Sequence, residues 1–250
     1  MLSIMYSGGL DSFIAYHYAI AHGHTPVDCI FVDMGHPYAK KEWEAIQRIP
    51  EEWRPKVDKL NMKELHSLIA RRLSNQIIPS RNVMLAVIGA MFNPRVWINA
   101  LDGEQNGKEH DKSVRFFEDT SALLTFTNEF FQKETIIESP FAEMTKAETI
   151  RWALDYGIPV DVLYNTTTCY DEHDQKCGRC LTCYKRKTAF LLNGLDEPGY
   201  AADPLAQDYA KECAAEIPLA AEAQDYSRFT RKRVSEHFQL LEILHGDKAP

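Results

Sequence analysis

Long apolar runs are missing from this chain of 250 residues. No stretch approaches the ~20 consecutive apolar residues that a helix needs to cross a bilayer. The N-terminus also lacks a basic segment followed by a long apolar stretch and a cleavage site. We therefore expect a cytoplasmic protein, in the host cytoplasm if a phage encodes it, with no membrane partner. The composition, 45% hydrophobic and 26% charged, is typical of a globular protein.

An excess of positive charge is missing as well. The chain carries 28 Lys and Arg residues against 36 Asp and Glu residues, which gives a formal net charge of −8. A protein that grips the phosphate backbone of nucleic acid needs a basic face or stripe. The charge balance therefore argues against nucleic acid as a direct partner and leaves open only a local basic patch.

Cysteine is scarce outside one segment. Two of the six cysteines, Cys29 and Cys213, stand alone, and we expect them to be isolated thiols. The other four fall inside fifteen positions: Cys169, Cys177, Cys180 and Cys183. In a cytosolic chain such crowding favours a metal site over disulfide bonds.

Short apolar runs rich in β-branched residues alternate with segments of helical period over the first half of the chain. We expect strands at 4–6, 29–32, 96–100 and 135–137, and helices near 11–21, 39–48, 63–73 and 81–92. This alternation predicts the α/β class with a doubly wound parallel sheet, over a domain of residues 1–140. Ligands bind beyond the carboxyl ends of the strands in such sheets, so the loops after the strands are where we expect the chemistry.

A small helical subdomain is expected at residues 141–193. The string Thr145-Lys146-Ala147-Glu148 has the form of a capping box and predicts a helix that ends near Tyr156-Gly157. The cysteine cluster follows, and then another helix that runs through Leu192. Residues 194–250 form a C-terminal extension, with helical segments expected at 201–224 and 234–244. We expect the extension to be a solvated appendage; an oligomer arm, a partner-binding segment and a lid are the alternatives.

A glycine-rich loop lies between the first strand and the first helix: Ser7-Gly8-Gly9-Leu10-Asp11-Ser12. Glycines let backbone N–H groups approach phosphate oxygens, and the helix N-terminus adds partial positive charge. The hydroxyls of Ser7 and Ser12 are further phosphate donors. The Asp11 carboxylate would repel phosphates unless a divalent cation lay between them, which indicates Mg²⁺ and a nucleoside triphosphate.

Two other interpretations of the loop differ in what they require. A kinase or GTPase would need the Gly-Lys-Ser/Thr of a Walker A loop, which is absent here. A purely structural turn would use Asp11 or Ser12 as the helix N-cap. The complete string resembles the signature of the PP-loop family, whose fold is similar to the adenine nucleotide alpha hydrolases. That resemblance implies ATP binding and adenylation of a carbonyl or carboxyl oxygen, with release of pyrophosphate.

The cysteine spacing suits a closed tetrahedral zinc site with four thiolate ligands, and Gly178 eases the tight turn between two of them. A closed site leaves no coordination position for water. We therefore expect one structural Zn²⁺ per chain, which orders this segment against the ATP-binding domain. A redox-active C-x2-C pair and an iron–sulfur cluster are the competing interpretations.

With both motifs placed, residues 1–193 resemble the 7-cyano-7-deazaguanine synthases of the QueC/ExsB-like family. Three further segments carry the resemblance: 33–36 (Asp-Met-Gly-His), 79–82 (Pro-Ser-Arg-Asn) and 139–141 (Ser-Pro-Phe). The most specific part is Thr168-Cys169-Tyr170, followed by Cys-Gly-Arg-Cys. The resemblance implies ATP-dependent adenylation of 7-carboxy-7-deazaguanine, reaction with ammonia to an amide, and a second activation that gives the nitrile. It also implies a homodimer.

Several site residues follow from the resemblance and from their position after strands. We expect the nucleotide to contact the segment Tyr6 to Ser12 and also Asp33 and Arg81, the last of these through phosphate or the substrate carboxylate. The expected catalytic residues are Asp11, Ser12 and Lys146, with Lys146 neutralising charge near the phosphates. A purine-like base is expected near acceptors of the next loop: Asp102, Gly103, Glu104 and Asp111. The alternative for Arg81, Lys146 and this loop is ordinary solvent exposure.

One departure from the family affects the substrate. The family usually carries a string like Tyr-Pro-Asp-Cys-Arg where this chain has His110-Asp111-Lys112-Ser113. The alternatives to a nitrile-forming synthase are therefore an enzyme that stops at the amide and one that joins the carboxylate to a protein amine. A tRNA-thiolating enzyme is a more distant alternative. A non-enzymatic alternative is a nucleic-acid-binding zinc module, for which Lys185-Arg186-Lys187 is the best support. We identify no glutaminase segment, so the source of ammonia stays open.

Overall fold

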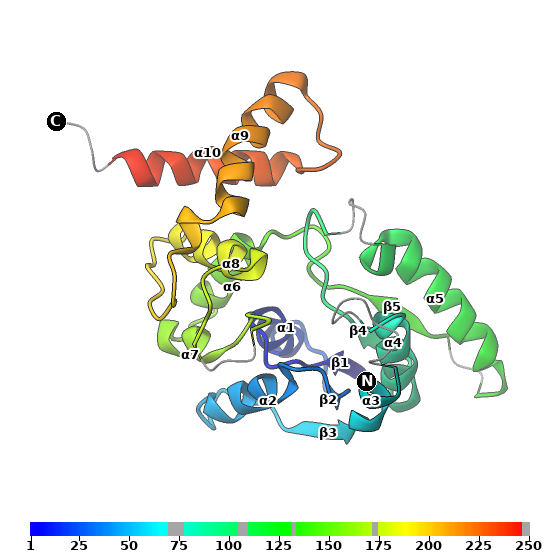
Figure 1. Ribbon diagram of the computed structural model, residues 1–250. Helices are drawn as coiled ribbons and strands as arrows, with labels where there is room; N and C mark the ends of the chain where they lie inside the picture. The colour runs from blue at the N-terminus through cyan, green and yellow to red at the C-terminus, as the bar shows by residue number, and fades with distance from the viewer. Residues whose placement is uncertain (70–77, 105–109, 132–133, 172–174, 247–250) are drawn as a thin grey trace.

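The computed structural model describes residues 1–69, 78–104, 110–131, 134–171 and 175–246. Five parallel strands form one sheet in the order β3-β2-β1-β4-β5 (Figure 1). The chain runs from β1 to β3 on one side and then crosses to β4 on the other, so the topological switch lies between β1 and β4. The strands are β1 (Leu2–Met5), β2 (Val27–Asp33), β3 (Val57–Asn61), β4 (Arg95–Trp97) and β5 (Ile136–Glu138).

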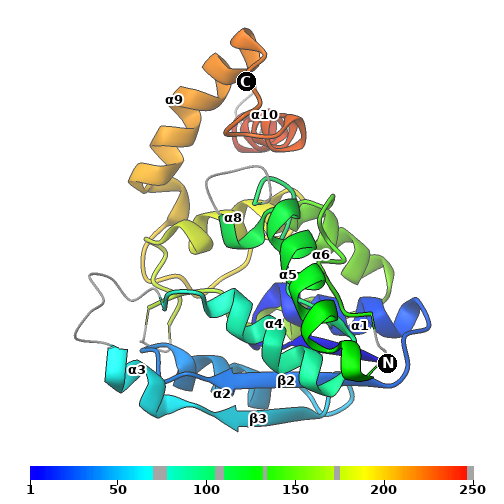
Figure 2. The ribbon, with the colours of Figure 1, turned by 90° about the vertical axis from the view of Figure 1, so that its right-hand side faces the viewer.

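Helices cover both faces of the sheet. Leu2 and Ile4 of β1 pack in one buried cluster with α1 (Leu10–Ala21), α2 (Ala39–Arg48) and the helices of residues 141–193, which we call the second unit. Met5 packs in a second cluster with α4 (Arg81–Phe92) and α5 (Val114–Thr127). Successive side chains of a strand point to opposite faces, so the central strand is buried on both. Its one polar residue, Ser3, donates to the Gly89 carbonyl at 2.9 Å. Figure 1 shows α1 and α2 on one side of the sheet and α4 and α5 on the other, and in Figure 2 α4 and α5 lie in front of the sheet. Helices on both faces confirm the predicted doubly wound α/β class.

Four predicted strands are present as β1, β2, β4 and β5, with ends that differ by up to three residues. The helices predicted at 11–21, 39–48 and 81–92 are also present. For the helix predicted at 63–73, the structure describes α3 (Lys63–Ile69), and the remainder lies outside the described residues. Three of the described strands and α-helices were not predicted: the edge strand β3, which is mostly exposed, α5, whose exposed Leu123 and Phe126 obscure its periodicity, and the short helix at Val160–Asn165.

The second unit begins with α6 (Lys146–Asp155), which starts at the predicted capping box. The Thr145 hydroxyl accepts from the Glu148 N–H at 3.2 Å, and the Glu148 carboxylate accepts from the Thr145 N–H at 2.8 Å. The chain continues through α7 (Val160–Asn165) to α8 (Leu181–Leu191). These three helices share the buried cluster of β1 and α1, so the unit has no separate core.

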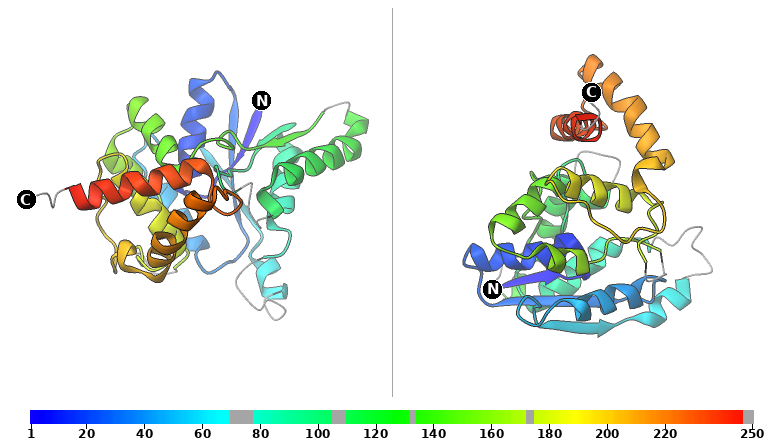
Figure 3. Two further views of the ribbon diagram at one scale, coloured as in Figure 1. Left: turned by 90° about the horizontal axis from the view of Figure 1, so that it is seen from above. Right: turned by 90° about the vertical axis from the view of Figure 1, so that its left-hand side faces the viewer.

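The C-terminal extension folds back over the second unit. It contains α9 (Asp208–Ala223) and α10 (Arg231–Gly246), which lie above α8 and α6 on the side remote from β3 (Figure 3). A buried cluster that includes Cys213, Ile217, Phe229 and Val234 holds these helices together and contacts Tyr184 of α8. The expectation of a solvated appendage is therefore wrong. None of the described helices is both long and apolar enough to span a membrane.

A buried ion pair fixes the start of this extension. The Arg186 guanidinium donates to both oxygens of Glu197, each at 2.9 Å from Nε, and both side chains are at most 1% exposed. Lys176 also donates to Glu197 at 2.7 Å. The remaining Arg186 donors reach the Leu163 carbonyl and the Thr166 hydroxyl, each at 2.9 Å, so the buried charge is fully partnered.

Replacing Glu197 by glutamine is expected to lower the free energy of unfolding by about 3–5 kcal/mol, because it leaves two cations without a counter-charge in a buried site. The adjacent Asp196 provides a matched control. Its carboxylate pairs with Lys187 but is 81% exposed, so Asp196→Asn is expected to cost at most ~1 kcal/mol. Urea unfolding of the purified proteins measures both costs. Equal costs for the two variants would contradict this assignment.

Candidate active site and metal centre

The glycine-rich loop occupies the turn between β1 and α1. Gly8 has a φ of 70°, and a Cβ there would lie 2.6 Å from the Glu42 carbonyl oxygen of α2. Only glycine fits this backbone without displacing α2. The helix N-cap is Gly9, with no side-chain cap, and the Ser12 hydroxyl donates to the Gly9 carbonyl at 3.0 Å. The alternative in which Asp11 or Ser12 caps the helix is therefore wrong.

Asp11 and Lys146 meet beside this loop, although 135 positions separate them. The Lys146 Nζ lies 2.5 and 2.8 Å from the two carboxylate oxygens of Asp11. Lys146 is the first residue of α6, so the Thr145 capping box fixes the backbone from which it reaches. The capped helix thus brings two of the three residues expected to be catalytic into one ion pair, and the third, Ser12, lines the cavity in front of this loop.

A cavity of about 330 Å³ opens in front of the loop. Its size falls within the range of small-molecule sites. Among the described residues, four buried polar atoms in its wall have no hydrogen-bond partner: Tyr6 Oη, His36 Nδ1, Asn99 Oδ1 and Thr167 Oγ1. Buried polar groups are nearly always paired, so unpaired ones around one cavity indicate a ligand that supplies the partners.

Arg81 lines this cavity from the start of α4, at the carboxyl edge of the sheet. Its guanidinium donates to the Tyr38 hydroxyl at 3.2 Å. The Tyr38 ring lies 5.2 Å from the ring of Tyr170 and 4.3 Å from that of His36, between centroids. His36 in turn contacts the Glu42 carboxylate at 2.9 Å. Arg81 therefore faces an aromatic wall of the cavity and is not an ordinary surface arginine.

Asp33 lies at the end of β2 but turns away from the cavity. Its side chain is almost fully buried, accepts from the Gly35 N–H at 3.2 Å, and lies 3.5 Å from both Lys59 and Lys63. Its neighbours Val32 and Met34 line the cavity in its place. The backbone around Asp33 is therefore better placed to contact a nucleotide than the Asp33 carboxylate itself.

Of the four residues expected to lie near the base, Glu104 is the one that lines the cavity. Its carboxylate lies 3.0 Å from Lys112 and 3.7 Å from Lys185. Burial raises the pKa of Glu104, but the positive charges of Lys112, Lys185 and Lys146 outweigh burial and lower it to about 2. The expected set of base-reading acceptors is not assembled, because the Asp102 carboxylate accepts from Thr230 of the extension.

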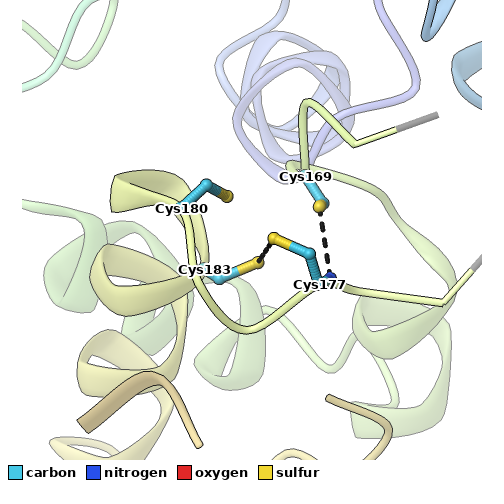
Figure 4. Close-up of side chains that lie close together, drawn as sticks. All are labelled: Cys169, Cys177, Cys180 and Cys183. Carbon is cyan, nitrogen blue, oxygen red and sulfur yellow. Dashed lines mark hydrogen bonds between the residues drawn. The ribbon is translucent and has the colours of Figure 1, made fainter. Parts of the chain in front are cut away.

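The four clustered cysteines bring their sulfur atoms within 4.8 Å of one another (Figure 4). Cys169 and Cys177 lie on loops, and Cys180 and Cys183 lie at the start of α8. The Cys177 and Cys183 sulfurs are 3.9 Å apart. Zinc–sulfur bonds of ~2.3 Å in a tetrahedron place sulfurs ~3.8 Å apart, so this donor set fits a closed Zn²⁺ site.

Backbone N–H groups point at these sulfurs. Cys169 Sγ accepts from the N–H groups of Asp171 and Cys177, each at 3.4 Å, and Cys177 Sγ accepts from Arg179 at 3.3 Å. Such donors stabilise thiolates, the form that binds metal. Gly178 forms the tight turn with a φ of 71°, and a Cβ there would overlap the carbonyl of Ala202 in the extension.

The cysteine cluster and the glycine-rich loop are joined through one short segment. The Thr167 N–H donates to the Gly8 carbonyl at 3.1 Å, two residues before Cys169.

The basic string after the cluster is not a nucleic-acid surface. Arg186 is buried on Glu197, Lys185 faces Glu104, and Lys187 bonds to Asp196. The main support for the nucleic-acid-binding alternative is therefore lost.

Several cavity residues were not singled out from the sequence, among them Tyr38, Glu42, Asn99 and Thr167. Glu42 and Tyr38 follow β2 within ten residues, and Asn99 follows β4 directly. The rule that ligands bind beyond the carboxyl ends of parallel strands was therefore a usable signal for these three. Thr167 carries no such signal, because its place depends on the packing of α7 and α8.

Known proteins resemble this chain over most of its length. The model of one family, described as "Queuosine biosynthesis protein QueC", matches residues 2–194. Relatives named 7-cyano-7-deazaguanine synthase from Archaeoglobus fulgidus and Methanopyrus kandleri are each 26% identical to it. These alignments cover 78% of this chain and 87% and 96% of the relatives. A relative with the same name from Sulfolobus acidocaldarius is also 26% identical, and this chain spans about half of its length, 46%.

Proposed function

Because this chain belongs to the QueC family of queuosine biosynthesis proteins, we propose that it converts 7-carboxy-7-deazaguanine and ammonia into 7-cyano-7-deazaguanine at the expense of ATP. The family membership is the one predicted from the sequence. The observation that most strongly supports the activity is the cavity itself. It joins the Asp11–Lys146 pair beside the glycine-rich loop to Arg81, Lys112 and Lys185 on its other walls.

The reaction requires two activations. A carboxylate is a poor electrophile, so its oxygen first attacks the α-phosphorus of ATP and displaces pyrophosphate. Ammonia then adds to the carbonyl carbon, AMP leaves, and an amide remains. The amide oxygen attacks a second ATP in the same way, and loss of AMP and protons from this intermediate gives the nitrile. One phosphate site serves both activations, since each transfers AMP to an oxygen at the same carbon.

The glycine-rich loop is the proposed phosphate site. The backbone from Tyr6 to Leu10 and the N-terminus of α1 donate to the phosphates, together with the hydroxyls of Ser7 and Ser12. Asp11 would hold Mg²⁺, which would supply positive charge to offset that of the phosphates. Lys146 donates to the same carboxylate from the start of α6, and we propose that it also offsets charge on the phosphates.

The opposite side of the cavity is the proposed substrate site. Arg81 offers paired donors of the geometry that a carboxylate accepts, and the rings of Tyr38 and Tyr170 provide apolar surface for a planar base. The backbone at Val32 and Met34 is proposed to meet the adenosine. An enzyme that stops at the amide is the second candidate, because His110-Asp111-Lys112-Ser113 departs from the family string.

Zinc is the proposed occupant of the four-cysteine site, one ion per chain, with a structural role. We divide the chain into an ATP-binding domain (1–140), a zinc-binding subdomain (141–193) and an extension (194–250). The Gly8–Thr167 hydrogen bond supports a role for the zinc segment in shaping the phosphate loop. We also propose a cytoplasmic location, where ATP is abundant and thiols stay reduced.

The first activation is testable without ammonia. Wild-type protein with Mg²⁺ and 7-carboxy-7-deazaguanine is expected to exchange labelled pyrophosphate into ATP, because adenylation is reversible while the intermediate stays bound. Omission of the carboxylate is expected to abolish the exchange. An absence of exchange under the complete conditions would contradict carboxylate adenylation.

A homodimer is proposed on the basis of the outer face of α5 and the short helix after it. Leu123, Phe126 and Phe130 are 54%, 74% and 90% exposed and are spaced three and seven positions apart. Exposed apolar clusters of this kind mark protein interfaces.

Light scattering during gel filtration is expected to give the mass of a dimer for the wild type and of a monomer for Phe126→Glu, since burying a carboxylate in an apolar contact is costly. Leu219→Glu is a matched control, because Leu219 is 64% exposed on α9. A wild-type monomer, or a Phe126→Glu dimer, would rule out this interface.

A further inference from the structure

The N-terminal half of α10 contacts the loop that follows β4. The Thr230 hydroxyl donates to the Asp102 carboxylate, and the Arg233 Nε donates to the Asp102 carbonyl oxygen at 3.2 Å. Gly103 has a φ of 77°, and a Cβ there would lie 2.6 Å from Arg233 Nε. The arginine is therefore packed directly against the backbone of this loop.

The same loop is a closed turn that ends at the cavity. The Asp102 N–H donates to the Met144 carbonyl at 2.9 Å, and the Glu104 N–H donates to the Leu101 carbonyl at 2.9 Å. The Leu101 N–H in turn donates to the Glu104 carboxylate at 3.3 Å. Arg233 holds this turn at Asp102, two residues before the carboxylate that binds Lys112 and Lys185.

The first two turns of α10 also contact the start of α6. The Glu236 carboxylate accepts from the Thr145 hydroxyl, and Lys232 donates to both Glu148 carboxylate oxygens at 2.9 Å. Thr145 and Glu148 are the capping-box pair that sets the first turn of α6, from which Lys146 reaches Asp11. One helix of the extension therefore touches the supports of two walls of the cavity.

The family match ends at residue 194, so α10 lies beyond the matched segment. Its contacts with the loop are polar and specific. They differ from the apolar contacts that join α10 to α9 and α8, which account for its stability. Packing of α10 on the second unit alone does not require the hydrogen bond from the Arg233 guanidinium to the Asp102 carbonyl oxygen.

We propose that α10 is a positioning element for the active site and that Arg233 positions the 101–104 loop for binding of the carboxylate substrate. This proposal rests on the proposed function. Loss of the guanidinium frees the turn at Asp102, and Glu104 then no longer holds Lys112 and Lys185 in place. The effect is expected on the substrate side of the cavity, since the glycine-rich loop and Asp11 have their own supports.

Arg233→Ala is expected to raise KM for 7-carboxy-7-deazaguanine roughly ten- to hundredfold, the factor of one charge-assisted hydrogen bond. KM for ATP and kcat are expected to change by less than about threefold, because Arg233 contacts neither the phosphate loop nor the reacting atoms. Arg228→Ala is the matched control. Arg228 bonds to Glu212 and Glu216 within the extension alone, and its variant is expected to retain all three constants.

Hydrogen exchange gives a readout that needs no turnover. The amides of Asp102 and Glu104 are expected to exchange faster in Arg233→Ala than in the wild type, while those of α1 keep their rates. Arg228→Ala is expected to leave both segments unchanged. If Arg233→Ala matches Arg228→Ala in KM and in exchange at residues 101–104, the positioning role is wrong. If the wild type itself lacks activity, the proposed function fails, and the exchange rates still decide the role of Arg233.

Discussion

Asp11→Ala is expected to lower the turnover number by about 10³-fold or more, the scale on which loss of one preorganised electrostatic group acts. In our account the Asp11 carboxylate holds the cation that neutralises the phosphates, and both activations depend on it. The fold is expected to survive, because Asp11 is partly exposed and the cap of α1 is the backbone of Gly9. Nitrile formation and circular dichroism measure the two outcomes.

Asp58→Ala provides the comparison for this result. Asp58 is an aspartate of the exposed edge strand β3 and does not line the cavity. Its variant is expected to keep wild-type turnover. An active Asp11→Ala protein would refute the role of Asp11 at the metal and phosphates, whereas an unfolded one would show that the Lys146 contact is needed for the fold.

Cys183→Ser is expected to reduce bound zinc from one ion per chain to below about a tenth, because a closed site with three thiolates loses most of its affinity. Cys183 is 1% exposed, and its sulfur lies 3.9 Å from that of Cys177. Without the ion, the segment that holds Thr167 against Gly8 is expected to lose its order, so activity falls together with metal content.

Cys213→Ser is the matched control for the zinc prediction. Cys213 is also buried, at 3% exposure, but lies in α9 among Tyr184 and Tyr209. This variant is expected to retain one zinc per chain. Elemental analysis of both proteins decides the matter. Full zinc in Cys183→Ser, or iron in the wild type, would contradict the structural zinc assignment.

The sequence predicted those parts of the fold that depend on local pattern. Buried strands such as β1 and β2 consist mostly of apolar residues. The capping box at Thr145 predicted the start of α6. The edge strand β3 could not be recognised, because hydrogen bonds to β2 form it and most of its side chains are exposed. Predictions therefore succeeded where the chain itself carries the information and failed where a neighbouring element supplies it.

The same distinction applies to the site. The residues from Ser7 to Ser12 are neighbours in the sequence, and the four cysteines are closely spaced. In the structure the first set forms one loop and the second forms one cluster. The Asp11–Lys146 pair joins residues 135 positions apart. The docking of Arg233 on Asp102 joins residues 131 positions apart and follows no periodic pattern. Contacts of this kind depend on the three-dimensional path of the chain. The prediction that the extension is a solvated appendage was therefore wrong.

One site of this protein is expected to activate the same carbon of the substrate twice. Purified protein with ATP, Mg²⁺, ammonium and 7-carboxy-7-deazaguanine is to be analysed by mass spectrometry for amide and nitrile, with AMP counted in parallel. Our account predicts 7-cyano-7-deazaguanine as the final product, with two AMP formed for each nitrile. Accumulation of the amide with one AMP would instead identify an amidating enzyme and contradict this expectation.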